Sequence, residues 1–209
     1  DLLIKDGRRV IALDNRGHGA SAAPHDPALY HSGRHLAEDV RRLMDHLGLE
    51  RADVMGFSMG AWITGHLAVR HPERLRSAIF GGLAMGMVEG LKGQETIAAA
   101  LEAEIDAEVT SPKARAYRAF GKQTGSDLKA LAACMRGSRQ PIPAGTLAGL
   151  EMPVLVAVGS RDEVAGSLDD FVALIPGAIG VTIPDKDHMA SVGDKVFKQA
   201  VTDFLAARP

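Results

Sequence analysis

The stretch Gly56-Phe57-Ser58-Met59-Gly60 decides how this chain is interpreted. A short strand-like apolar run precedes it, and the run after it, 61–70, has apolar residues near helical spacing. A serine at a strand-to-helix turn adopts a sparsely populated backbone conformation, and flanking glycines let strand and helix approach closely. We therefore predict that this turn presents the hydroxyl of Ser58 as a nucleophile. The alternative is a serine that only caps the helix.

Strand and helix patterns alternate along much of the chain. Apolar runs typical of strands, several of them continuous like buried parallel strands, occupy residues 9–14, 52–57, 75–80, 153–158 and 178–183. Helical patterns are found at 34–47, 58–70, 167–175 and 192–207. This alternation predicts an α/β fold, with a mostly parallel sheet and helices on both faces.

The pattern changes in the middle of the chain. Residues 84–148 contain no convincing strand, and their helical patterns lie at 97–109, 112–121 and 126–136. We interpret 84–148 as a helical cap insertion over the end of the sheet, with 1–83 and 149–209 forming the core. The alternative is a helical subdomain with only a structural role.

Two further side chains could activate the serine. A serine hydroxyl is a weak nucleophile that needs a base, and the base needs an orienting group. His188 follows the strand pattern at 178–183, and Asp162 follows the strand pattern at 153–158. Catalytic groups gather at the carboxyl edge of parallel sheets. The chain order Ser, Asp, His therefore predicts Ser58 as nucleophile, Asp162 as orienting acid and His188 as base.

Other carboxylates compete with Asp162 for the orienting role. Glu163 adjoins Asp162, while Asp185 and Asp187 precede His188. We favour Asp162, because neighbours in sequence rarely face each other productively. Asp187 is then expected to tune the charge of its loop.

The sequence offers little for a metal or a nucleotide cofactor. His31 and His35 have the spacing of a helical metal pair, but no third ligand completes the set. The glycines at 17 and 19 lack the lysine and hydroxyl residues that follow a phosphate loop. We therefore expect no metal and no cofactor, and we expect these glycines to form a turn.

Bulk composition excludes several partners. The 209 residues carry a net charge of −2, which gives no electrostatic reason to expect nucleic acid or an anionic membrane. No apolar run approaches the roughly 18 residues of a bilayer span. The single cysteine, Cys134, excludes an intrachain disulfide and fits a reducing compartment, so a cytoplasmic location is expected. Composition does not indicate an oligomeric state.

The chain resembles the α/β-hydrolase superfamily in four motifs that occur in the family's order: Asp14-Asn-Arg-Gly-His-Gly-Ala-Ser21, Gly56-Phe-Ser-Met-Gly60, Gly159-Ser-Arg-Asp162 and Asp187-His188. The likeness covers nearly the whole chain and is weakest in 84–148, where that family carries its variable cap. The resemblance implies the same Ser, Asp and His roles, and the backbone N–H of Met59 as one oxyanion donor.

One departure from the family concerns its first strands. The family normally places its earliest strands, and a loop with a His-Gly type motif, before the strand that would end at Asp14. That loop supplies the second oxyanion donor, and losing one such donor typically costs about 10²–10³ in rate. Nothing before Asp1 supplies these elements here. We therefore expect that these residues are part of a longer protein.

The motifs together predict a serine hydrolase. Its substrate is expected to be a small carboxylic ester or a related acyl compound, and its methionines at 59, 85 and 87 either line an acyl pocket or fill the core. Lactonases, carbon–carbon bond hydrolases, acyltransferases and perhydrolases of this superfamily use the same triad, so these reaction types stay open. The alternative from another class is a non-catalytic ligand-binding protein with a vestigial triad.

Overall fold

The computed structural model describes residues 2–208, which divide into two compact units. The first unit holds the residues through Ala12, Val40–Gly90 and the residues from Pro141 on. The second unit holds Leu13–Asp39 and Leu91–Gln140. The expected division into a core and a cap at residues 84 and 148 stays a prediction.

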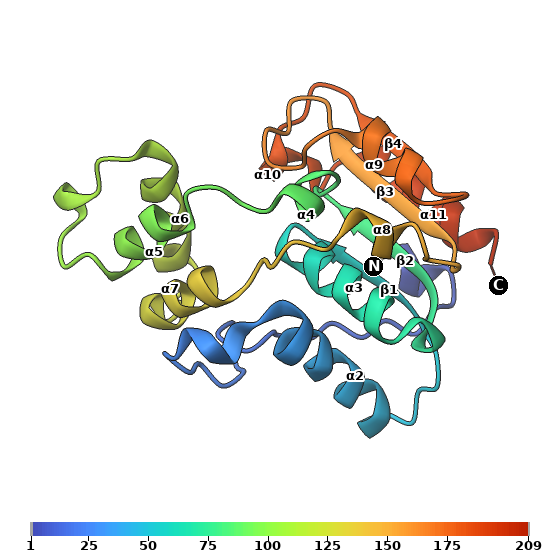
Figure 1. The fold of residues 1–209 in the computed structure, drawn as a ribbon, viewed down its shortest axis with the longest axis horizontal. Coiled ribbons are helices and arrows are strands. Elements are labelled where there is room, and N and C mark those ends of the chain that lie inside the picture. Colours follow the sequence, from blue (N-terminus) through green and yellow to red (C-terminus); the bar gives the residue numbers. More distant parts are fainter. Residues whose placement is uncertain (1, 209) are drawn as a thin grey trace. The chain divides into compact units, whose positions relative to one another are not determined.

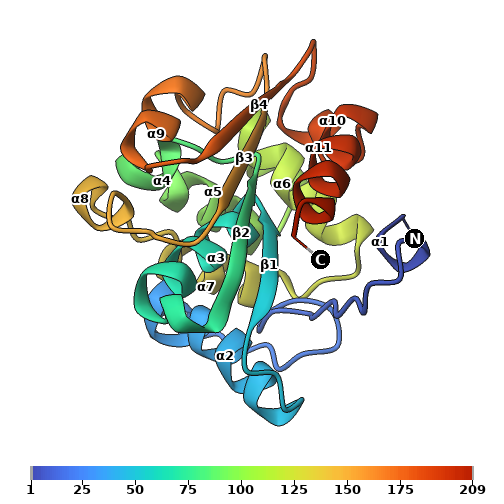
Figure 2. The same cartoon turned by 90° about the vertical axis from the view of Figure 1, so that its right-hand side faces the viewer.

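The first unit is built on a parallel sheet of four strands. The strands pair in the order β1-β2-β3-β4, and all three pairings are parallel (Figure 2). Their bounds are β1 Ala52–Phe57, β2 Leu75–Gly81, β3 Val154–Gly159 and β4 Ile179–Ile183. The strands predicted in these four places are confirmed, and the fold is α/β as expected.

Helices connect and cover these strands. Those of the first unit are α1 Leu2–Lys5, α3 Met59–Arg70, the 3₁₀ helix η3 Pro72–Arg74, α4 Gly86–Glu89, α8 Ala144–Leu147, α9 Leu168–Leu174, α10 His188–Ser191 and α11 Lys195–Ala206. Helix α2, Ala37–His46, begins in the second unit and ends in the first. The predicted helices at 34–47, 58–70, 167–175 and 192–207 are confirmed within a few residues at each end.

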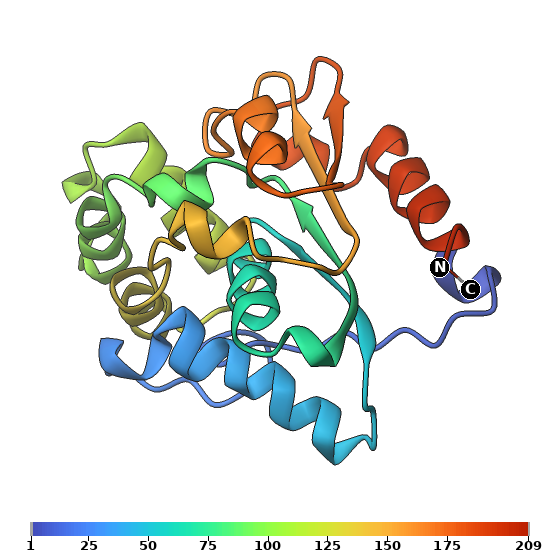
Figure 3. The same ribbon diagram turned by 45° about the vertical axis from the view of Figure 1, so that its right-hand side comes forward.

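Alternate residues of the strands pack on opposite faces of the sheet, because side chains along a strand point up and down in turn. Ile79 of β2 belongs to a buried cluster with Phe197 and Phe204 of α11. The ring of its neighbour Phe80 packs against the ring of Phe171 in α9, with the two ring centroids 6.1 Å apart. Helix α11 therefore covers one face and α9 the other, as Figure 3 also shows. Helices on both faces were predicted from the sequence.

The second unit is helical. Its helices are α5 Gln94–Glu102, α6 Pro112–Gln123 and α7 Leu128–Gly137, with the short helices η1 Pro27–Tyr30, η2 Ser32–Leu36 and η4 Asp106–Glu108 (Figure 1). Helices α5, α6 and α7 share a buried apolar cluster that includes Ile97, Ala114 and Met135. None of the helices between residues 2 and 208 combines the length and the apolar character needed to cross a bilayer.

One strand prediction was wrong. Residues 9–14 form no strand, and Val10 and Ile11 are 47% and 40% exposed. A strand is stabilised by its hydrogen-bonded neighbours, and among residues 2–208 no strand pairs with this run. An apolar run can show which residues favour an extended conformation, but the ladder that holds them there must come from another segment.

A buried arginine joins the helices of the second unit. Arg118 of α6 donates from Nη1 to the carbonyl oxygens of Ala100 and Leu101 in the last turn of α5, at 2.9 Å each. Its Nε donates to Asp106 at 2.6 Å, and Lys122 also reaches this carboxylate. These carbonyls at the end of α5 would otherwise lack intrahelical donors.

These contacts predict an acid-sensitive step in stability. Hydrogen bonds from Lys122 and Arg118 lower the pKa of Asp106 from 3.8 to about 2. A carboxyl whose pKa is lower in the folded state stabilises the fold above its unfolded pKa, and this contribution is lost as pH falls from about 4 towards 2. In thermal unfolding of the whole chain, we expect Asp106→Asn to lower the midpoint at pH 6. The difference from wild type should shrink between pH 4 and pH 2. A difference that stays constant over this range would contradict the assignment.

Candidate active site

Ser58 lies at the corner between β1 and α3. Its φ of 54° and ψ of −113° place a non-glycine residue in a sparsely populated backbone conformation. Such a residue costs of order 1–3 kcal/mol, so the surroundings must hold it in place. The N–H of Ser58 donates to the carbonyl oxygen of Gly81 in β2 at 2.8 Å. The strained corner predicted from the sequence is therefore present.

The two glycines of the motif have different roles. An ideal Cβ on Gly56 would lie 2.0 Å from both the carbonyl carbon and the carbonyl oxygen of Gly60, so the strand and the helix touch at Gly56. An ideal Cβ on Gly60 would meet no atom within 4 Å. The expectation that both glycines remove steric bulk holds for Gly56. Gly60 instead contributes the backbone that Gly56 contacts.

Asp162 lies in the turn that follows β3. Its Oδ1 accepts hydrogen bonds from the backbone N–H groups of Val164 and Ala165 at 2.9 and 3.1 Å. Its Oδ2 lies 2.8 Å from Nδ1 of His188, and the Asp162 side chain is 0% exposed. A buried carboxylate that accepts several hydrogen bonds is fixed in direction.

His188 is the first residue of α10, which follows β4. Its Nδ1 faces Asp162, and its Nε2 lies 2.9 Å from Oγ of Ser58. The carboxylate of Asp187 caps α10 by accepting from the N–H of Ala190 at 2.8 Å. The structure therefore brings the three predicted side chains into one hydrogen-bonded chain. An acceptor at Nδ1 favours the tautomer whose Nε2 can accept the proton of the serine hydroxyl.

The loops that carry the acid and the histidine are joined by their backbones. Arg161 donates its N–H to the carbonyl oxygen of Lys186 at 2.9 Å, and Asp185 donates its N–H to Oγ of Ser160 at 2.9 Å. An ideal Cβ on Gly159 would lie 2.2 Å from the carbonyl oxygen of Lys186. The close contact therefore needs glycine at position 159. These roles of Gly159 and Ser160 were not predicted from the sequence, although a glycine directly after a strand pattern was a signal.

The competing carboxylates have other contacts. Asp185 pairs with Arg161 at 2.6 Å, and its side chain is 78% exposed. Asp187 caps its own helix, and Glu163 is exposed. Of these four carboxylates, Asp162 is the one that faces Nδ1 of His188. Its role as the orienting acid stays a prediction. For Met87, the sequence left open whether it lines a pocket or fills the core. Met87 is fully buried, and its Sδ would lie 2.7 Å from a Cβ on Gly65 of α3. It fills the core.

His31 and His35, which have the sequence spacing of a helical metal pair, lie at the start of η2 and within it. The Nδ1 of His31 accepts from the N–H groups of Gly33 and Arg34 at 3.2 and 3.3 Å, which caps η2. Between residues 2 and 208, no group of three or more metal-ligating side chains lies close enough to hold a metal ion.

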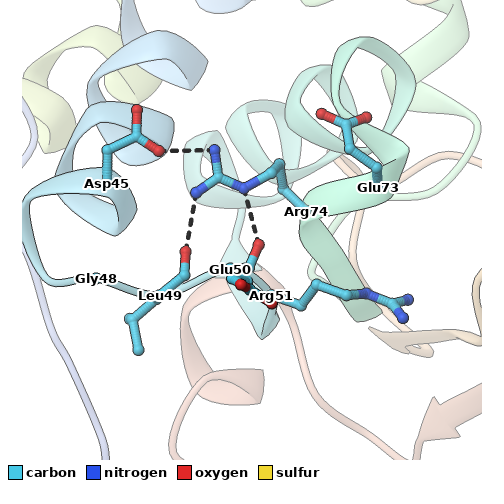
Figure 4. A pocket seen from close by; sticks show the side chains of 7 residues that line it. All are labelled: Asp45, Gly48, Leu49, Glu50, Arg51, Glu73 and Arg74. Carbon is cyan, nitrogen blue, oxygen red and sulfur yellow. Dashed lines mark hydrogen bonds and ion pairs between the residues drawn. The ribbon is translucent and has the colours of Figure 1, made fainter.

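A separate hollow of about 590 Å³ lies near the amino-terminal ends of β1 and β2, whereas Ser58 lies at the carboxyl end of β1. Figure 4 shows the residues that line this hollow. Arg74 spans it, donating from Nε to the carbonyl oxygen of Glu50 and from Nη2 to that of Leu49, with Nη1 2.8 Å from Asp45. The hydrogen bond from Arg74 holds the pKa of Asp45 below its ordinary value. This arginine joins η3 to the loop before β1 and to α2.

The parallel sheet and the serine at its strand-to-helix corner define a fold of the α/β-hydrolase type. A family model described as alpha/beta hydrolase fold matches residues 1–99. The solved structure of a hydrolase from Pseudomonas aeruginosa PA01 is 31% identical, with a TM-score of 0.74, and the match covers 92% of this chain and 77% of that one. The chain belongs to the α/β-hydrolase superfamily.

Two lactonases are also similar to this chain. The enol-lactonase from Burkholderia xenovorans LB400 is 26% identical with a TM-score of 0.67, over 92% of this chain and 79% of that one. The 3-oxoadipate enol-lactonase 2 of Acinetobacter baylyi is 40% identical over 81 residues, which are 39% of this chain and 29% of the lactonase. Curated relatives that match at 39–44% identity are each matched over less than a third of their length.

Proposed function

We propose that this chain carries the acyl-transfer centre of a serine hydrolase that cleaves a small carboxylic ester or a related acyl compound. The observation that carries the proposal is the continuous hydrogen-bonded chain from Asp162 through His188 to Ser58, at 2.8 and 2.9 Å. A nucleophile, a base and an orienting acid at these distances are what nucleophilic catalysis by serine requires.

The reaction then runs in two halves. The Oγ of Ser58 bonds to the acyl carbon while its proton passes to Nε2 of His188, and a tetrahedral oxyanion forms. The bond to the leaving group breaks, His188 returns the proton to the departing oxygen, and an acyl-enzyme remains. Water attacks this ester with the same proton transfers, which releases the acid and restores Ser58. Asp162 stabilises the imidazolium in both halves.

The oxyanion is proposed to bind at the first turn of α3. Met59 is the first residue of this helix and directly follows the nucleophile. A backbone N–H at a helix N-terminus points towards an anion at the corner and lies at the positive end of the helix dipole. We propose this N–H as one oxyanion donor, as the family resemblance implies.

The substrate class follows from the chemistry and from the relatives. The mechanism needs an electrophilic acyl carbon and uses no cofactor, and we propose a small molecule as the substrate. Two of the similar proteins are enol-lactonases. A lactone is a cyclic ester, and its opening uses the same attack by Ser58 without release of a separate alcohol. Linear esters and lactones are therefore the first substrates to examine.

Covalent labelling tests the proposal. A fluorophosphonate probe should modify the wild-type protein at one site, and peptide mass spectrometry should find the adduct on Ser58. Ser58→Ala should abolish the adduct, whereas Ser126→Ala, a serine of the second unit, should leave it unchanged. A folded wild-type protein that takes up no probe would refute the proposal and favour the non-catalytic binder.

A further inference from the structure

The aromatic ring of Phe57 lies between the catalytic histidine and the core. Phe57 is the last residue of β1 and precedes Ser58. Its ring centroid is 5.3 Å from that of His188, with the planes inclined at 48°. It also contacts the ring of Phe197 from α11 edge-on, at 6.0 Å. Phe197 is buried in the core cluster that it forms with Ile79 and Phe204, and Phe57 packs against this cluster.

The end of β2 leaves room for this ring. An ideal Cβ on Gly81 would lie 2.7 Å from Cδ2 of Phe57, and one on Gly82 would lie 2.5 Å from its Cζ. Both glycines therefore bring backbone, rather than side chain, against the ring. A ring that rests on backbone has little freedom to move, because close-packed neighbours cannot shift independently.

The other groups around His188 fix only part of its orientation. Asp162 contacts Nδ1 and Ser58 contacts Nε2, and these two hydrogen bonds leave the imidazole able to rotate about the line that joins them. The charged groups of the loop are paired elsewhere, Arg161 with Asp185 and Lys186 with Asp194. Asp187 caps its own helix. Phe57 places an uncharged ring against the imidazole.

We propose that Phe57 is a positioning residue for His188, an inference that rests on the proposed function. The ring restricts this rotation of the imidazole and so keeps Nε2 aligned with Oγ of Ser58. Phe57 touches neither the reacting carbonyl nor the leaving group in this scheme.

Steady-state kinetics with a p-nitrophenyl ester test this role. Phe57→Leu should lower kcat about tenfold, because a flexible side chain in place of the ring leaves the imidazole less well aligned with Oγ of Ser58. KM should stay within about twofold, because the ring does not bind substrate. Gly81→Ala, which places a methyl group against the Phe57 ring, should lower kcat in the same way. Thermal unfolding should show that each variant is folded.

Val201→Ala is the matched control, because Val201 belongs to the same core cluster but lies on α11. It should lower stability and leave kcat near the wild-type value. An unchanged kcat in Phe57→Leu, a rise in KM that equals the fall in kcat, or an equal loss in Val201→Ala would each overturn the inference. In each of these three outcomes the wild-type protein is still labelled by fluorophosphonate at Ser58, so the proposed function stands while the role of Phe57 fails. If the wild-type protein is not labelled, the proposed function itself fails.

Discussion

Replacing Asp162 with asparagine is expected to slow the acylation of Ser58 by about 10⁴-fold, the loss typical of an orienting acid that becomes an amide. Asparagine has nearly the same shape, and its carbonyl oxygen can still accept from the N–H groups of Val164 and Ala165. Its NH₂ group would then donate to Nδ1 of His188. That contact favours the tautomer with the proton on Nε2, which cannot accept a proton from Ser58.

The matched control is Asp187→Asn. Asp187 adjoins His188 and has the same type of side chain as Asp162, but its carboxylate caps α10. Asparagine caps helices about as well as aspartate, so the stability of the protein should stay close to that of wild type. The rate constant of labelling should change by no more than about twofold. The measurement is the second-order rate constant of fluorophosphonate labelling, with circular dichroism as the check on folding. If Asp187→Asn loses as much as Asp162→Asn, the assignment of the orienting acid is wrong.

Gly56→Ala is expected to destabilise the protein by about 3 kcal/mol or more. The new methyl group would lie 2.0 Å from the carbonyl group of Gly60 and 2.6 Å from the N of Ala61. All of these atoms are backbone, so no side-chain rotation can relieve the overlap. Strand β1 and helix α3 would have to separate, and Ser58 between them would move away from His188. Labelling by fluorophosphonate should therefore fall together with stability.

Gly60→Ala belongs to the same motif and should behave in the opposite way. Its methyl group would enter open space at the second position of α3. Alanine favours the helical conformation over glycine by up to about 1 kcal/mol, so stability should stay level or rise slightly. Urea unfolding of both variants gives the comparison. Similar losses in the two variants would show that the contact at Gly56 is not what requires glycine.

Local patterns were enough to predict most of the regular structure. The four strands of the sheet and the helices that cover it are confirmed, because apolar periodicity reports directly which residues face a core. The residues of the hydrogen-bonded triad could also be named. A serine between glycines after a strand, and polar residues after two later strands, are local signals that point to one edge of a parallel sheet.

Contacts between distant segments decided the rest. The sequence could not choose finally between Asp162 and its neighbours, because only the folded loops show which carboxylate faces His188. It could not show that Phe57 contacts His188, or that Gly159 must lack a side chain beside Lys186.

The strand that was predicted at 9–14 also shows that a local pattern does not determine contacts between distant segments. Its apolar residues indicate a strand, yet no strand among residues 2–208 pairs with it and it stays irregular. Apolar periodicity depends on a residue and its near neighbours in the chain, and the sequence by itself determined these. Hydrogen-bonded ladders and site geometry depend on atoms that are far apart in the chain, so only the tertiary structure decided them.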